Sequence, residues 1–203
     1  MASKPRLKAK VTSIEKAANK TVDAGDESAL LREANKRLKQ AEMLLAVSRR
    51  VAAIETLDEI LETLVEMTTW ELQAERGSLF LNDVQTGELY SRVAQGNFSR
   101  EIRILNTTGV AGAIFQNAVG EIIPDAYADS RFNRAIDEQT GFKTRSILCA
   151  PVKTVKGEII GVIQVLNKKD GEFIEEDLEL LEAMTPQAAV ALQSTQFVET
   201  MKK

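Results

Sequence analysis

The spacing of apolar residues changes along this 203-residue chain, and each change predicts a different kind of element. From residue 28 to residue 55, leucine and small residues recur in alternating steps of three and four, which is the heptad spacing of a coiled-coil-like helix. Ser28 is a candidate N-cap. The stripe is narrow, as in a seam between two helices, so we favour a parallel dimer; packing on the helix's own domain is the alternative. The seam comprises Leu31, Ala34, Leu38, Ala41, Leu45, Ser48 and Ala52.

A second amphipathic helix is predicted from Leu57 onward, because its apolar residues fall on one face. Trp70 is expected to complete the packing of this helix against a sheet. The apolar face comprises Leu57, Ile60, Leu61, Leu64, Val65 and Thr68.

Short apolar runs separated by turn residues follow, and they predict antiparallel strands. Residues 77–83 and 89–96 surround a glycine-containing turn, and residues 145–154 and 158–169 form a hairpin around "VKG". Residues 121–126 predict a brief edge strand, because they contain a proline that cannot donate to a sheet ladder.

Two further helices complete the predicted fold. One begins at Thr108 or Gly109 and ends at Gly120, and the other is a long C-terminal helix in which Pro186 predicts a kink. We therefore predict an α+β fold with a central antiparallel sheet of about six strands. Helices lie on one side of this sheet, a ligand-covering lid lies on the other, and the coiled-coil-like helix precedes it.

The composition excludes several kinds of chemistry. The chain has no histidine, which removes imidazole bases and most zinc sites, and its one cysteine excludes an intramolecular disulfide. That cysteine, Cys149, lies in an apolar run and is predicted to be a core residue. Residues 1–27 are basic and poor in apolar side chains, which predicts a disordered tail without nucleic-acid contacts. No run is long enough to span a bilayer and no secretory signal is evident, so we expect a cytoplasmic protein without membrane insertion.

The stretch of residues 125–152 contains a long polar segment between two apolar runs that predict strands, and such segments are usually functional or disordered. It places the short polar side chains of Asp137, Thr140 and Thr144 where they can converge on a polar ligand. Capping of a short helix is the alternative interpretation.

The stretch "TTGVAGAI" places free backbone N–H groups of Val110 and Ala111 at a helix start among small residues. Such a start offers unpaired donors and a partial positive charge, so it suits an anion. An ordinary helix cap is again the alternative.

Four motifs occur in order along the second half of the chain: "PDAY", "RFNR", "TGFKTRSILC" and "VLNK". With this spacing, residues 43–197 resemble the cyclic-nucleotide-binding class of GAF domains, found in cyclic nucleotide phosphodiesterases and cyanobacterial adenylyl cyclases. The resemblance implies a GAF domain over residues 56–197, followed by a tail at 198–203. It implies a regulatory module without catalytic residues or a metal, whose ligand is cAMP or cGMP and which has no other cofactor.

The resemblance also assigns residues to the ligand. Val110 and Ala111 are expected to offer backbone N–H groups to the cyclic phosphate, and Ser78 is expected to face the purine. The complete implied set of ligand-binding residues is Ser78, Ala94, Gln95, Val110, Ala111, Asp137, Thr140, Thr144 and Gln164.

The family also carries a signature in which a lysine and an aspartate form an ion pair that steadies the lid of the pocket. Here the signature reads Asn167, Lys168, Phe173 and Asp177, followed by Leu178 where the family has glutamate.

The function implied is a cyclic-nucleotide sensor in a bacterial signalling protein. A homodimer through the N- and C-terminal helices is expected to transmit ligand state to an output domain such as an adenylyl cyclase. We favour cAMP over cGMP, because Gln95 and Gln164 stand where carboxylates would pair with the donors of guanine, whereas amides serve either base. A GAF domain with an empty pocket, acting as a dimerisation or interaction platform, is the alternative.

Overall fold

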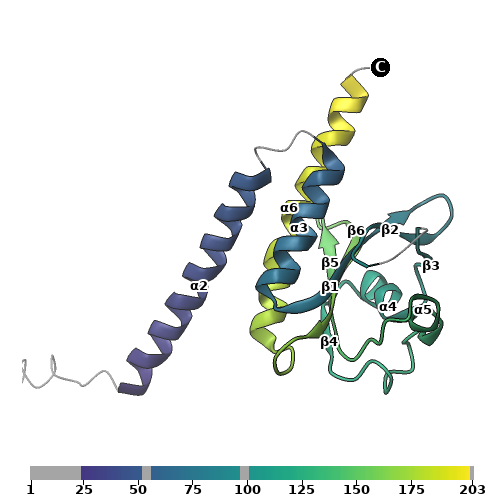
Figure 1. The fold of residues 1–203 in the computed structure, drawn as a ribbon. Helices are drawn as coiled ribbons and strands as arrows, with labels where there is room; N and C mark the ends of the chain where they lie inside the picture. The colour runs from purple at the N-terminus through teal and green to yellow at the C-terminus, as the bar shows by residue number, and fades with distance from the viewer. Residues whose placement is uncertain (1–23, 52–55, 97–100, 202–203) are drawn as a thin grey trace, which may run out of the picture. The chain divides into compact units, whose positions relative to one another are not determined.

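The computed structural model describes residues 24–51, 56–96 and 101–201, with side chains for residues 28–50, 56–96 and 101–193 (Figure 1). Most of the predicted basic tail, Ala52 of the predicted seam and the last two residues lie outside these ranges. The chain forms two compact units, Met1–Glu42 and Met43–Lys203.

Helix α2 (Ala24–Val51) begins before the predicted N-cap. Ser28 therefore lies inside the helix, and the cap prediction was wrong. Serine inside a helix costs only about 0.5 kcal/mol relative to alanine, so a serine with capping potential does not by itself start a helix.

The predicted seam of α2 is exposed. Leu31, Leu38 and Leu45 are 59%, 57% and 52% exposed. Within the second unit, Met43 and Val47 of the same helix are instead buried in the hydrophobic core. The part of the helix that belongs to the second unit thus packs on the domain through Met43 and Val47, which the heptad pattern did not select.

An antiparallel sheet of six strands forms the centre of the second unit, in the order β3-β2-β1-β6-β5-β4. The two longest strands, β1 (Ala74–Asp83) and β6 (Ile159–Lys168), lie in the middle of it. The predicted edge strand, β4, is indeed at an edge. The other strands are β2 (Glu88–Ala94), β3 (Arg103–Leu105), β4 (Glu121–Ile123) and β5 (Ile147–Lys153).

Helices lie on both faces of the sheet (Figure 1). Helices α3 (Leu57–Glu71) and α6 (Glu175–Met201) pack on one face, whereas α4 (Gly109–Asn117) and the short α5 (Arg134–Thr140) lie on the other. The alternation along β1 follows from this arrangement: Leu79 joins the core beneath α3 and α6, and Phe80 joins the core beneath α4. The predicted α+β architecture with a six-stranded antiparallel sheet is confirmed, and the long polar segment contains α5. The prediction that helices lie on one side of the sheet was wrong, because α4 packs on the lid side over its own apolar core.

Trp70 does not pack against the sheet, because it is 72% exposed. The prediction was wrong for a reason visible in the helix itself. Glu62 and Glu66 are also exposed, and steps of four place Trp70 on their outward stripe rather than on the buried face. The buried face of α3 comprises Leu61, Leu64, Val65, Thr68 and Thr69.

Helix α4 ends earlier than predicted. Its C-cap is Ala118, which adopts the left-handed conformation with φ of 58°, and not Gly120. Gly120 is required for close packing instead: a Cβ there would lie 2.8 Å from Leu178 Cδ1 and 3.2 Å from the Cys149 carbonyl oxygen.

Helix α6 continues through Pro186. A proline cannot donate to the carbonyl four residues earlier, which is that of Glu182. The hydroxyl of Thr185 donates to this oxygen at 3.0 Å, so the acceptor remains satisfied. The kink at Pro186 stays a prediction.

Candidate functional site

A cavity of about 340 Å³ lies on the face of the sheet that carries α4 and α5. Strands β1, β5 and β6 form its floor, and the start of α4 and the segment around α5 form its walls. The volume falls in the range of small-molecule sites, which is about 300–1,000 Å³. The lining comprises Phe80, Ile104, Thr108, Gly109, Val110, Ala111, Arg131, Phe132, Asn133, Ile136, Asp137, Thr144, Ile147, Gln164 and Leu166.

Two polar side chains on the sheet are free to bind a ligand. Ser78 of β1 lies directly opposite Gln164 of β6, and directly opposite residues point to the same face. Ser78 is only 5% exposed, yet among the described residues neither its hydroxyl nor the Gln164 amide has a hydrogen-bond partner. Among the described residues no buried side-chain nitrogen or oxygen lacks a partner, so the free polar atoms of this pair are accessible and can bond a ligand on the cavity side of the sheet.

The start of α4 is open to an anion. Its N-cap, Thr108, makes no side-chain cap, because its hydroxyl donates to the Leu105 carbonyl at 3.2 Å instead. The first N–H groups of a helix have no intrahelical acceptor. The N–H groups of Val110 and Ala111, which line the cavity, can therefore donate to a ligand there. Together with the helix dipole, they favour one negative charge.

Helix α5 is held by one buried carboxylate. Asp137 is 6% exposed and accepts hydrogen bonds from the Thr144 N–H at 2.6 Å and the Thr144 hydroxyl at 2.7 Å. The Tyr127 hydroxyl donates to the same carboxylate at 3.1 Å. Burial, followed by this hydrogen bond to Asp137, raises the pKa of Tyr127. Asp137 therefore joins the chain before α5 to the chain after it.

Asn167 fixes the exit of the same segment. It has φ of 58° and is completely buried, and its side-chain oxygen accepts from the Arg145 N–H at 2.6 Å. Its amide donates to the Lys143 carbonyl at 2.9 Å and to Glu75 at 2.8 Å. The Arg145 guanidinium, also bonded to Glu75, is the main cause that lowers the pKa of Glu75.

The remaining signature residues lie between the end of β6 and the first turn of α6. Lys168 forms an ion pair with Asp177, and its Nζ also lies 5.6 Å from the centre of the Phe173 ring. Leu178, which departs from the family pattern, is buried in the core beneath α3 and α6. The departure therefore leaves the ion pair in place.

The cavity wall also contains a cluster that the sequence did not single out. The Arg131 guanidinium bonds Glu121 and Asp129, each at a closest distance of 2.7 Å. Arg131 is the main cause that lowers the pKa of Asp129. The motif "RFNR" was a signal for this cluster, but a motif does not show which carboxylates an arginine meets.

The structure brings together five of the nine residues predicted to bind the ligand. Ser78 lies on the same face beside Gln164, whereas Ala94, Gln95 and Thr140 are not part of the cavity lining. The Gln95 amide oxygen accepts from the Gly77 N–H at 2.8 Å, and Thr140 accepts from the Phe142 N–H at 3.3 Å. The five lining residues are Val110, Ala111, Asp137, Thr144 and Gln164.

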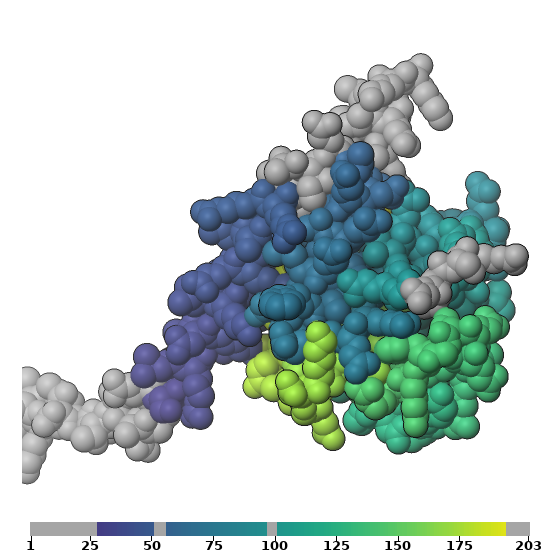
Figure 2. Space-filling view, in the orientation of Figure 1, coloured from purple at the N-terminus to yellow at the C-terminus, as the bar shows by residue number. Residues whose placement is uncertain are grey.

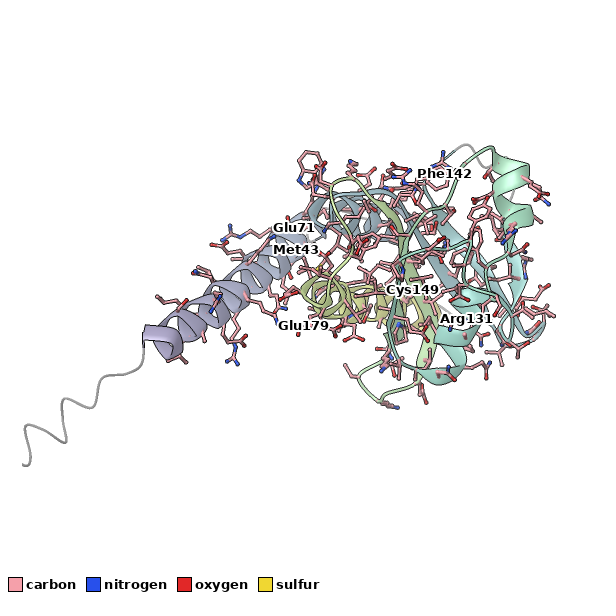
Figure 3. All side chains as sticks on the ribbon, turned by 90° about the horizontal axis from the view of Figure 1, so that it is seen from below. Met43, Glu71, Arg131, Phe142, Cys149 and Glu179 are labelled. Carbon is pink, nitrogen blue, oxygen red and sulfur yellow. The ribbon has the colours of Figure 1, made fainter. Side chains whose placement is uncertain are left out.

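Cys149 is completely buried within the domain (Figure 3), and burial raises its pKa far above the ordinary value of a thiol. It is a core residue, as predicted. Within the described ranges, no group of three His, Cys, Asp or Glu residues is suited to a metal ion. No helix in that part of the chain is long and apolar enough to cross a membrane.

Residues 56–192 match the sequence pattern of the GAF domain. The chain belongs to the GAF domain family. This GAF domain has relatives among cyclic nucleotide phosphodiesterases. The probable 3′,5′-cyclic phosphodiesterase pde-5 of Caenorhabditis elegans is 29% identical over 181 residues, which cover 83% of this chain and 25% of the relative. The dual 3′,5′-cyclic-AMP and -GMP phosphodiesterase 11 of Drosophila melanogaster is 35% identical over 145 residues, 63% of this chain and 10% of the relative.

The chain thus spans a quarter or less of the length of these two relatives. Among solved structures, the GAF domain of a phosphoenolpyruvate-protein phosphotransferase from Coxiella burnetii has a TM-score of 0.72 at 19% identity, covering 80% of this chain and 98% of that one. The free methionine-R-sulfoxide reductase of Neisseria meningitidis has a TM-score of 0.66 at 18% identity, covering 78% of this chain and 91% of that one. At these identities the structural likeness concerns the fold alone.

Proposed function

We propose that this GAF domain is a regulatory module that binds a cyclic nucleotide in the cavity between α4 and α5. One observation carries the proposal: the uncapped start of α4 and the unpartnered pair Ser78 and Gln164 border the same side of the sheet. A cyclic nucleotide has a single negative charge at one end and a hydrogen-bonding base at the other, which suits this division. The relatives named for cyclic nucleotide phosphodiesterases support the same ligand class.

We favour cAMP over cGMP as the ligand. Guanine presents donors at N1 and N2 that a free carboxylate would accept. The carboxylates in or beside the cavity are engaged: Asp137 by Thr144 and Tyr127, and Glu121 by Arg131. Gln164 and Ser78 are left for the base, and the Gln164 amide can accept from the adenine amino group.

Calorimetric titration with cAMP, cGMP and 5′-AMP tests this proposal. We expect saturable binding of cAMP, weaker binding of cGMP, and weaker binding of 5′-AMP, because its phosphate is dianionic and lacks the ring. Gln164→Ala is expected to weaken cAMP binding about tenfold, which is the net contribution of one hydrogen bond. The matched control is Gln85→Ala, since Gln85 lies in the exposed turn after β1. The proposal is overturned if neither cyclic nucleotide binds saturably with a Kd below about 100 μM, which corresponds to a binding free energy of roughly 5–6 kcal/mol. The domain would then be a dimerisation or interaction platform.

We further propose that a second copy of the chain covers the seam of α2 and that this dimer transmits ligand state to an output domain such as an adenylyl cyclase. Exposed leucines at heptad spacing support a coiled coil. Leu38→Glu is expected to shift the protein from dimer to monomer in analytical ultracentrifugation. Asn35→Glu introduces the same charge at an exposed position off the seam and should leave the dimer intact. If the unsubstituted protein is a monomer, the proposed dimer is contradicted.

A further inference from the structure

Tyr127 lies in the long polar segment, ahead of α5, and it does not line the cavity itself. The segment around α5, green in Figure 2, forms part of the surface of the domain. The Tyr127 hydroxyl reaches into this segment and donates to Asp137, which also accepts two hydrogen bonds from Thr144. Three donors from both flanks of α5 therefore converge on one carboxylate of the helix.

The Tyr127 ring is itself held in place. The Arg134 guanidinium lies 5.0 Å from the ring centre, and Arg134 Nη2 donates to the Tyr127 carbonyl at 2.8 Å. The ring centre of Phe132, a residue that lines the cavity, lies 5.3 Å from that of Tyr127. The tyrosine thus contacts a cavity residue through its ring and the helix through its hydroxyl.

We propose that Tyr127 is a positioning residue that, through Asp137, holds α5 closed over the cavity. The inference deepens the proposed function and rests on it for the identity of the ligand. Three donors from the protein converge on its carboxylate, so the part that Asp137 plays in this proposal is to fix the lid. A bound molecule that leaves past α5 disturbs this set of hydrogen bonds, so the hydrogen bond from Tyr127 slows dissociation. It does not change the preference between cAMP and cGMP, because Tyr127 does not line the cavity.

Tyr90 provides a matched control. It is a half-buried tyrosine of β2 with an arginine, Arg103, 5.3 Å from its ring centre, much as Arg134 lies over Tyr127. It packs on the opposite face of the sheet, and its hydroxyl has no hydrogen-bond partner among the described residues. Tyr90→Phe therefore removes the same atom without removing a lid contact.

The test compares Tyr127→Phe, Tyr90→Phe and the unsubstituted protein in two measurements. Hydrogen exchange without nucleotide should show faster exchange of residues 127–145 in Tyr127→Phe alone, with β1 and β6 unchanged. Stopped-flow kinetics with a fluorescent cAMP analogue should show dissociation about tenfold faster in Tyr127→Phe, the effect of one hydrogen bond to a charged group. The association rate and the ratio of cAMP to cGMP affinity should stay the same, which general loosening of the fold would not produce.

The outcomes separate the two proposals. If the unsubstituted protein binds no cyclic nucleotide, the proposed function fails, and lid exchange alone decides the role of Tyr127. If exchange of residues 127–145 is the same in Tyr127→Phe and Tyr90→Phe, the positioning role is overturned whatever the nucleotide does. Faster lid exchange with an unchanged dissociation rate also overturns it, because the lid would then not control release.

Discussion

Lys168 Nζ lies 2.8 Å from Asp177 Oδ1 and 2.9 Å from Asp177 Oδ2, and the two side chains are only 15% and 14% exposed. The pair joins the end of β6 to the first turn of α6, where Asp177 also accepts from the Ile174 N–H at 3.0 Å. Because Asn167 precedes Lys168, the ion pair and the bonds that fix the exit of the lid lie at adjacent residues.

Lys168→Met is expected to lower the free energy of unfolding by about 1–3 kcal/mol, because it leaves a largely buried carboxylate without its cation. Urea unfolding measures the change. Lys169→Met is the matched control, since Lys169 is the exposed neighbour. Equal losses in the two variants contradict a specific contribution of the ion pair.

Thr108→Asp is expected to change stability and ligand binding in opposite directions. An aspartate at this N-cap can accept from the open N–H groups of α4, which stabilises the fold by about 0.5–1 kcal/mol. The same carboxylate occupies the position proposed for the cyclic phosphate and repels its negative charge. The affinity for cAMP should therefore fall by about tenfold or more.

Thr108→Asn separates these two effects, because asparagine caps a helix without adding a charge. Thermal unfolding and calorimetry of both variants give the comparison. Unimpaired cAMP binding by Thr108→Asp argues against an anion at the start of α4.

Gln164→Glu is expected to shift the ratio of affinities toward cGMP by about tenfold, because a carboxylate accepts from the donors of guanine and repels the N1 acceptor of adenine. Competition with both nucleotides measures the ratio. Gln85→Glu adds the same charge at an exposed turn and should leave the ratio unchanged. An unaltered ratio in Gln164→Glu shows that this residue does not read the base.

Thr185→Val tests how α6 accommodates its proline. Loss of the hydroxyl leaves the Glu182 carbonyl without its 3.0 Å hydrogen bond, which is expected to destabilise the protein by about 1–2 kcal/mol. In a Pro186→Ala background, the residue 186 N–H can satisfy that carbonyl, so the same substitution should cost less. A double-mutant cycle by urea unfolding checks this, and additive losses reject the coupling.

Asp129→Asn is expected to reduce the pH dependence of stability. Arg131 holds the pKa of Asp129 below its ordinary value, so Asp129 contributes stability that is present above the unfolded pKa of about 3.9 and is lost as the pH falls through the folded pKa. The variant should be less stable near neutral pH, and the difference should shrink in acid below about pH 4.

Thermal unfolding of Asp129→Asn from neutral to acidic pH follows this difference. The exposed carboxylate of Asp170 supplies the control as Asp170→Asn. If the stability difference between Asp129→Asn and the unsubstituted protein stays constant below about pH 4, the linkage to Arg131 is ruled out.

The sequence alone determined the elements whose residues carry a local pattern. The apolar spacing from Leu57 predicted the buried face of α3, and the short runs predicted the strands and the edge position of β4. The small residues around Gly109 predicted an open helix start, because the absence of bulky side chains and an intrahelical acceptor are local properties of a helix end.

The tertiary structure decided what depends on segments that meet across the fold. Trp70 looked like a core residue by type, but the register of α3 turned it outward. Gly120 looked like a helix end, whereas the approach of Leu178, distant in sequence, is what requires a glycine there. The role of Tyr127 appeared only once Asp137 and Thr144 were brought to it, because the direction of a side chain and the partner it meets are set by packing and not by spacing along the chain.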